Sequence, residues 1–204
     1  MKTYFIARTY SFIHLLLLMA APATYAQETF LKYRVMQNNT LIGIMTLQKK
    51  STADETHLSM LIEVKKRLLL MFDIHETHQE TFANGILMHA WVKREINGKT
   101  KVTRQIYRAM PGYIKIEDEK KKATAMQPVY STILGMHFEE PVAITEVFSD
   151  NHQQMVKLSP LGNHSFKITM PDGNKSFFYY TNGICSRVVA HHNFYTLEFI
   201  LTTE

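Results

Sequence analysis

Residues 165–191 read SFKITMPDGNKSFFYYTNGICSRVVAH, and this stretch decides the fold class. It holds three short runs rich in aromatic and β-branched residues, separated by Asp172-Gly173 and Asn182-Gly183. Such pairs mark β-hairpins, because both residues tolerate the positive φ angles of a tight two-residue turn. The stretch therefore predicts three antiparallel strands: Ser165–Met170, Lys175–Thr181 and Ile184–His191.

The same pattern continues towards both ends of the chain. Asn38-Asn39, Asn84-Gly85 and Asn97-Gly98 are further turn signals between runs of strand-forming residues. Twelve strands with short connections predict a mainly β protein with a large curved antiparallel sheet or half-open barrel. The remaining predicted strands are Phe30–Gln37, Thr40–Lys49, His57–Lys66, Leu70–Phe82, Ile86–Ile96, Lys99–Ala109, Tyr113–Asp118, Gln153–Leu158 and Phe194–Thr202.

Two segments depart from the strand pattern. The segment 128–138 has apolar residues at helical spacing after Pro128, and it predicts a short helix that plugs one end of the sheet. One or two short helices are expected in total. The run Glu117–Lys122 has three acids followed by three lysines, and it predicts a solvated loop.

The first 26 residues have the composition of a secretory signal peptide. Lys2 and Arg8 precede an apolar stretch, Phe12–Ala21, and small residues follow it. Cleavage is expected after Ala26, with Ala23 and an uncleaved anchor as alternatives. Residues 27–204 would then form a single antiparallel β domain, exported and most consistent with the periplasm. The sequence near Ala26 has no cysteine for lipid attachment, and no later run is long and apolar enough to cross a membrane as a helix.

Composition narrows the classes of partner and chemistry. Residues 27–204 hold 21 basic and 18 acidic residues, a net charge of +3, which together with export argues against nucleic acid as a partner. Cys185 is the single cysteine, so it cannot form an intrachain disulfide, and its surroundings favour a buried apolar role over a nucleophile. The glycines are scattered at turns and form no phosphate-binding loop, so no cofactor is predicted.

Counting outward from the predicted turns pairs residues across the strands. Trp91 falls opposite Arg104, and Phe178 falls opposite Arg187. The same counting pairs Tyr33 with Ile44, Val35 with Ile42, His89 with Ile106, Phe166 with Tyr179, and Ile168 with Phe177. Cations beside rings have two interpretations: long side chains covering the outer face of a broad sheet, or a semi-polar cavity for an anionic amphiphile. The second interpretation selects Trp91, Arg104, Tyr107, Phe178 and Arg187 as ligand-binding residues.

The segment His75–Glu80 concentrates residue types that bind metal ions. On a strand, alternate residues share a face, so Glu76, His78 and Glu80 converge, whereas His75 points the other way. This makes the three residues weak metal-site candidates, and a polar strand facing solvent is the favoured interpretation. Asp150, His152 and Ser159 fall in one loop region, where turn composition explains them better than hydrolytic catalysis.

Several turn and packing positions together resemble a known family. They are Ile42-Gly43, Glu139-Glu140-Pro141, Glu146–Ser149, Pro171–Asn174 and Tyr179–Gly183. With these, the chain resembles the exported bacterial family known as domain of unknown function 6134, from about Tyr33 to Phe199. The resemblance implies a periplasmic protein with a curved sheet around a helix. That design is similar to outer-membrane lipoprotein carriers, which bind acyl chains in the hollow of the sheet, and it implies no catalytic residues.

Three functions follow as hypotheses, in this order. The first is a non-enzymatic envelope protein that binds a lipid or other amphiphile, or an envelope protein, in the hollow of its sheet. The second is a structural or interaction domain with a filled core and an exposed sheet edge as its docking surface. The third, and weakest, is a metal-assisted hydrolase that uses convergent His and carboxylate groups.

Overall fold

The computed structural model describes residues 26–67, 71–117 and 119–202, and for residues 66, 67, 71 and 72 it describes the backbone alone. The predicted signal peptide and its cleavage therefore lie outside the described residues, apart from Ala26 itself, and remain predictions. Within the described residues, fourteen strands form one antiparallel sheet in the order β8-β7-β6-β5-β4-β3-β2-β1-β14-β13-β12-β11-β10-β9. The strands are β1 (Gln27–Gln37), β2 (Thr40–Ser51), β3 (Glu55–Arg67), β4 (Met71–Ala83), β5 (Ile86–Ile96), β6 (Lys99–Ala109), β7 (Gly112–Glu117), β8 (Lys120–Thr124), β9 (Glu146–Ser149), β10 (Gln154–Gly162), β11 (Ser165–Thr169), β12 (Lys175–Thr181), β13 (Ile184–His191) and β14 (Thr196–Leu201).

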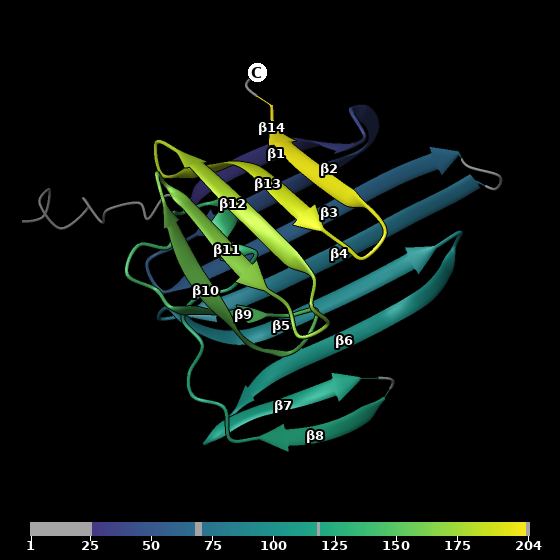
Figure 1. Cartoon of the computed structure of the whole chain (residues 1–204). Helices are drawn as coiled ribbons and strands as arrows, with labels where there is room; N and C mark the ends of the chain where they lie inside the picture. Colours follow the sequence, from purple (N-terminus) through teal and green to yellow (C-terminus); the bar gives the residue numbers. More distant parts are fainter. Residues whose placement is uncertain (1–25, 68–70, 118, 203–204) are drawn as a thin grey trace, which may run out of the picture.

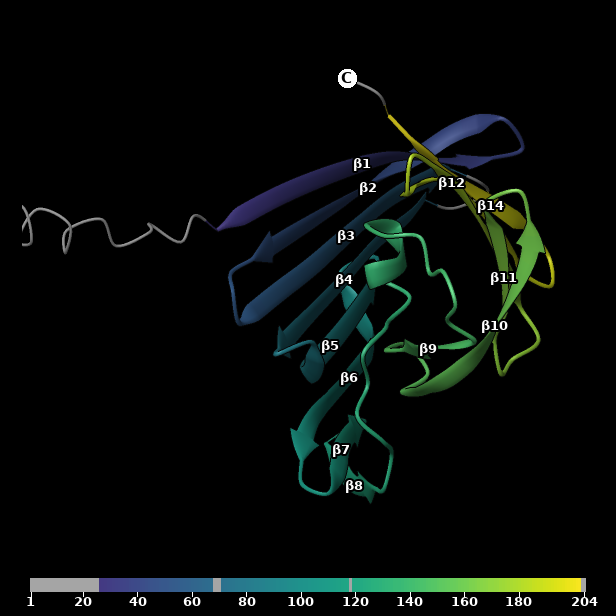
Figure 2. The same cartoon turned by 90° about the vertical axis from the view of Figure 1, so that its left-hand side faces the viewer.

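The sheet is strongly curved, which confirms the predicted mainly β class. The long strands β1–β6 form a broad wall, and β10–β14 curl over its concave face without closing a barrel (Figures 1 and 2). β1 pairs with β14, so the first and last strands lie side by side in the middle of the sheet. The described residues contain no helix of the length and apolarity needed to span a membrane.

Four hairpins have a β-bulge at the same position after a tight turn, and these bulges contribute to the curvature of the sheet. Each begins with a two-residue turn at positive φ, namely 38–39, 84–85, 97–98 and 182–183. Two residue pairs follow each turn, and the register then shifts by one, which leaves the third residue of the returning strand unpaired. Such β-bulges bend a strand and increase its twist. The extra residues are Ile42, Met88, Lys101 and Ser186.

These bulges make the predicted cross-strand pairs wrong by one position. Trp91 faces Gln105 rather than Arg104, and Phe178 faces Val188 rather than Arg187. At the turn after β11, a three-residue loop, 171–173, replaces the predicted two-residue turn, with the same effect. The other observed pairs are Tyr33–Met45, Val35–Gly43, His89–Tyr107, Phe166–Phe178 and Ile168–Ser176.

The hollow of the sheet is filled by the chain's own segment 126–148. A single 3₁₀ turn, η1 (Gly135–His137), lies within it (Figure 2). The predicted longer helix from Pro128 is wrong, because the backbone at 131–133 pairs with β9: Ile133 donates to the Phe148 carbonyl (3.0 Å) and Phe148 to the Ser131 carbonyl (2.9 Å). The predicted plugging position is correct, since Leu134 and Phe138 belong to the core under β1–β6.

The charged run at residues 117–122 is part of a hairpin and not a loop. Glu117 pairs with Lys120 at the end of β7 and β8, and β8 forms one edge of the sheet. Lysines on an edge strand discourage pairing with another chain, which accounts for Lys120, Lys121 and Lys122 there. Asp118 lies outside the described residues.

Cys185 is fully buried, as predicted. Burial raises the pKa of its thiol to about 12, so the group is not a nucleophile at neutral pH.

Candidate functional site

A row of ionisable side chains on β4 forms the centre of a buried polar cluster. Glu76, His78 and Glu80 all point to the concave face, as strand alternation predicts, while His75 faces outward and contacts Glu63 and Asp73. His78 is 4% and Glu80 2% exposed, so the favoured interpretation of a solvent-facing strand is wrong. The physical reason is that segment 131–153, from the far end of the sheet, packs over this face.

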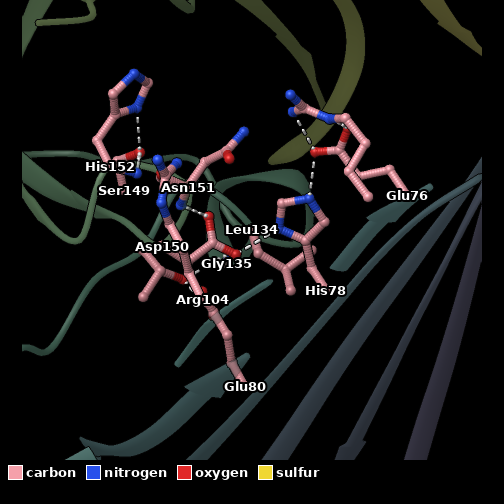
Figure 3. Close-up of polar contacts among 12 residues, drawn as sticks. Glu76, His78, Glu80, Arg104, Leu134, Gly135, Ser149, Asp150, Asn151 and His152 are labelled. Atoms are coloured by element: carbon pink, nitrogen blue, oxygen red, sulfur yellow. Dashed lines mark hydrogen bonds and ion pairs between the residues drawn. The ribbon is translucent and has the colours of Figure 1, made fainter. Parts of the chain in front are cut away.

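His78 lies between two carboxylates and contacts one with each ring nitrogen (Figure 3). Its Nδ1 is 2.5 Å from Asp150 Oδ2, and its Nε2 is 2.8 Å from Glu76 Oε1. Two carboxylate acceptors require two N–H donors, which only the protonated ring supplies. Burial opposes the charge, but the attraction and hydrogen bond of Asp150, then of Glu76, raise the pKa of His78 to about 10.

Arg94 on β5 completes the charge balance. Its Nε donates to Glu76 Oε2 at 2.5 Å and its Nη2 to Glu76 Oε1 at 2.9 Å, a bidentate pair. Burial alone would raise the pKa of Glu76, but the hydrogen bonds from His78 and Arg94 outweigh it and lower that pKa to about 2. The chain Arg94–Glu76–His78–Asp150 thus alternates positive and negative charge across the concave face.

Glu80 is the unbalanced member of the cluster. Thr132 donates its hydroxyl to Glu80 Oε2 at 2.6 Å, while the buried Oε1 has no hydrogen-bond partner among the described residues. Burial and the nearby negative charge of Asp150 raise the pKa of Glu80 to about 8. The carboxyl group is therefore neutral at neutral pH, and no uncompensated charge is added to the balanced cluster.

The turn 149–153 between β9 and β10 is held on the wall of the sheet by polar contacts. Besides the Asp150–His78 pair, Arg104 donates to the Asn151 carbonyl. Gln153 Nε2 donates to the Gln105 carbonyl at 2.6 Å. These contacts join the β9–β10 end of the sheet to β4–β6. They could not be predicted from the sequence, because Asp150 lies 72 residues from His78.

The metal-site hypothesis receives no support from this geometry. Glu76 and His78 are occupied by each other and by Arg94 and Asp150. Within the described part of the chain, no three His, Cys, Asp or Glu side chains are arranged to hold a metal ion. As it stands, the cluster pins two distant parts of the sheet together.

The five predicted ligand-binding residues do not converge. Trp91 and Tyr107 lie on the outer face, opposite to the buried Ala90 and Ile106. Arg104 lies on the concave face, where it pairs with Glu117. Phe178 is buried against His137, and Arg187 is exposed, over the Tyr179 ring and paired with Glu198.

A cleft of about 480 Å³ opens between the ends of β2–β4 and the segment 130–144. Its walls include apolar side chains such as Leu58, Phe82 and Phe138, and the charged residues Lys49, Glu139 and Glu140 also line it. Tyr130 and Val142 also line it, although they are 64% and 72% exposed. Sequence reasoning did not find this cleft, because its lining comes from segments up to 95 positions apart, from Lys49 to Ile144.

A serine, a histidine and an aspartate do lie in series, but only His152 belongs to the group considered in the sequence, because Ser149 and Asp172 take the places of Ser159 and Asp150. Ser149 Oγ is 3.1 Å from His152 Nδ1, and His152 Nε2 is 3.7 Å from Asp172 Oδ2. Ser149 is buried and also accepts the backbone N–H of His152, the geometry of a local turn. A buried hydroxyl engaged in a turn does not present a nucleophile to a substrate.

Comparison with known proteins supports the fold. The sequence model of the family DUF6134, a domain of unknown function, matches residues 33–202. No curated protein matches the chain. Among solved structures, the β-barrel-like protein of domain of unknown function DUF1849 from Brucella abortus superposes with a TM-score of 0.59. The match covers 89% of this chain and 98% of that one at 10% sequence identity, so the likeness concerns the fold alone.

Proposed function

The chain belongs to the DUF6134 family, and we propose that it is a non-enzymatic, exported envelope protein that binds an amphipathic ligand in the cleft between β2–β4 and segment 130–144. The cleft is the observation that carries the proposal. Its size falls within the roughly 300–1,000 Å³ of small-molecule sites, and it combines an apolar wall with charged residues.

The position of the ligand differs from the sequence-based hypothesis. Segment 126–148 occupies the hollow of the sheet, so an acyl chain has room at its rim and not at its centre. Tyr130 and Val142 of this segment line the cleft and are exposed, and a bound apolar chain would cover them. Lys49, which forms no ion pair within the described residues, would attract an anionic head group.

Native mass spectrometry tests the proposal. The protein would be produced through its own leader, purified gently and measured before and after organic extraction. A stoichiometric amphiphile that disappears on extraction is the expected result. The variant Tyr130→Ala, Val142→Ser should lose it, whereas Leu161→Ser, which changes another exposed apolar residue near the end of β10, should retain it.

A second function, a protein-docking domain, is favoured by the filled hollow. A packed interior leaves the outer surface as the place for contacts. An unliganded mass, combined with no binding of added fatty acid, would reject the amphiphile proposal in favour of this one.

A further inference from the structure

Positive charge is concentrated in one sector of the sheet. Residues 93–124, which span β5 to β8, contain ten Lys and Arg and only four acidic residues, a net charge of +6. The rest of residues 27–204 contains eleven basic and fourteen acidic residues, a net charge of −3. The protein is therefore electrically polarised, and the β7–β8 hairpin of the basic sector projects from the body (Figures 1 and 2).

The outer face of this sector carries a row of apolar and aromatic side chains. Trp91, Gln105, Ile116 and Lys121 are paired in sequence across β5, β6, β7 and β8, so they share one face. The neighbouring row, two positions along the strands, contains Tyr107 and Ile114. These four apolar side chains, Trp91, Tyr107, Ile114 and Ile116, are partly exposed and form what we call the outer patch.

Lysines lie beside the outer patch and along its edge strand. Lys93, two residues from Trp91 on the same face of β5, is paired with Glu95 at 2.8 Å, and Lys121 ends the Trp91 row on β8. Lys120 and Lys122 flank Lys121 on the same short strand, and all three are exposed. On the other face, Lys122 stands directly opposite Lys115, with no acidic partner within the described residues, so the surplus charge is not neutralised internally.

We infer that the outer patch and its lysines dock the protein on an anionic lipid bilayer. Trp and Tyr favour the boundary between head groups and acyl chains, where the ring is shielded and the polar atom stays hydrated. Lys extends its aliphatic stem along the same boundary and places its ammonium among anionic head groups.

Shape and charge favour a bilayer over a protein partner. The outer patch lies on the convex side of a curved sheet. A deformable lipid surface adapts to a convex face, whereas a folded partner would need a matching hollow. This docking is independent of the cleft, which opens on the concave side.

Trp91 provides a direct readout, because it is the single tryptophan of the chain. The full protein would be mixed with vesicles of phosphatidylcholine alone, and with vesicles of phosphatidylcholine and phosphatidylglycerol. Co-sedimentation with the anionic vesicles only, a blue shift of Trp91 emission and quenching by brominated lipid are expected. High salt should release the protein, because exposed charges are then screened.

Two variants that remove the same charge from different surfaces distinguish docking through the outer patch from nonspecific electrostatic attraction to the vesicle. Lys121→Gln, Lys122→Gln should reduce binding to anionic vesicles by roughly tenfold or more, and it should fold normally because it removes the unfavourable Lys115–Lys122 juxtaposition. Lys157→Gln, Lys175→Gln removes the same charge from β10 and β12 and should bind as the unmodified protein does.

Three outcomes would overturn the inference: equal binding to neutral vesicles, binding without a change in Trp91 emission, and no binding to either vesicle. A Trp91 response to soluble poly-glutamate in the absence of vesicle binding would point instead to an acidic protein partner.

Discussion

At the scale of single residues, the double protonation of His78 is what lets the sheet bury four charges. Its imidazolium separates the carboxylates of Glu76 and Asp150, each of which contacts one ring nitrogen. Removing one partner of a buried ionic network leaves an uncompensated charge and typically costs about 3–5 kcal/mol. His78 therefore contributes to the stability of the fold by compensating the charges of Glu76 and Asp150. A neighbouring histidine on the same strand provides a control.

We predict that His78→Gln lowers the free energy of unfolding by about 3–5 kcal/mol. The reason is that Glu76 and Asp150 lose the cation between them. His75→Gln, three residues away on the outer face of the same strand, should change it by less than about 1 kcal/mol. Urea unfolding of both variants provides the comparison, and equal losses would contradict the assigned role of the cluster.

Glu80 gives stability a specific dependence on pH. An unfolded chain loses this proton near its ordinary pKa of 4.5, whereas the folded protein keeps it up to about 8. Between those values the folded state binds more protons, so stability falls as pH rises and the loss is complete above about 8. His78 adds a further fall between 6.5 and about 10 for the same reason.

We predict that Glu80→Gln removes the first part of this decline, since an amide does not titrate. Urea unfolding at a series of pH values between 5 and about 8 should show a flatter profile than that of the unmodified protein. Glu117→Gln, at an exposed ion pair with Arg104, should leave the slope in place. A slope unchanged in Glu80→Gln would show that another group titrates in this window.

At the scale of elements, turn chemistry predicted the strands well but not their register. Asn-Gly pairs located the hairpins, and the observed strand ends agree closely with those turns. The bulges at Ile42, Met88, Lys101 and Ser186 share no residue type, so composition did not reveal them, although each is the third residue after a two-residue turn. β8 and β9 were missed as well, since one is a lysine run and the other is a strand of four residues.

Gly43 and Gly98 are glycines for different reasons: the first lacks room for a Cβ, and the second has a positive φ in a turn. A Cβ at Gly43, next to the first bulge, would collide with the backbone carbonyl of Glu63 on β3. We predict that Gly43→Ala lowers the free energy of unfolding by more than about 2 kcal/mol, because backbone must move. Gly98→Ala meets nothing within 4 Å, and its positive φ should cost only about 1 kcal/mol. Thermal unfolding that ranks the two in the opposite order would contradict the tight approach of β2 and β3.

At the scale of the whole molecule, the candidate site depends on contacts that no local pattern encodes. Alternation on β4 correctly grouped Glu76, His78 and Glu80, but their burial depends on segment 131–153. Thr132 is 52 residues from Glu80, and Asp150 is 72 residues from His78. Only the curvature of the sheet brings these residues together, so the cluster could not have been predicted before the topology was known.

Polar contacts attach turn 149–153 to β4–β6, and they hold the open sheet in its curled shape. If these contacts hold the β9–β10 end in place, weakening them should loosen that end before the rest of the sheet. We predict that Gln153→Ala, which removes the hydrogen bond to the Gln105 carbonyl, accelerates amide hydrogen exchange in β9 and β10 by about tenfold. Exchange in β3 and β4, within the continuous wall, should stay close to that of the unmodified protein.

Asp172→Ala serves as the control for this loosening. Asp172 is exposed and lies 3.7 Å from His152 of the same turn. Within the described residues it contacts His152 and Asn174 and not the wall formed by β4–β6, so Asp172→Ala should leave β9 and β10 protected. Uniformly faster exchange in every strand of Gln153→Ala would mean that the sheet opens as one cooperative unit. Faster exchange confined to β9 and β10 would instead identify the turn as the contact on which the curled shape depends. β9 is the terminal strand, and among the described residues it pairs, apart from β10, with the short stretch around Thr132.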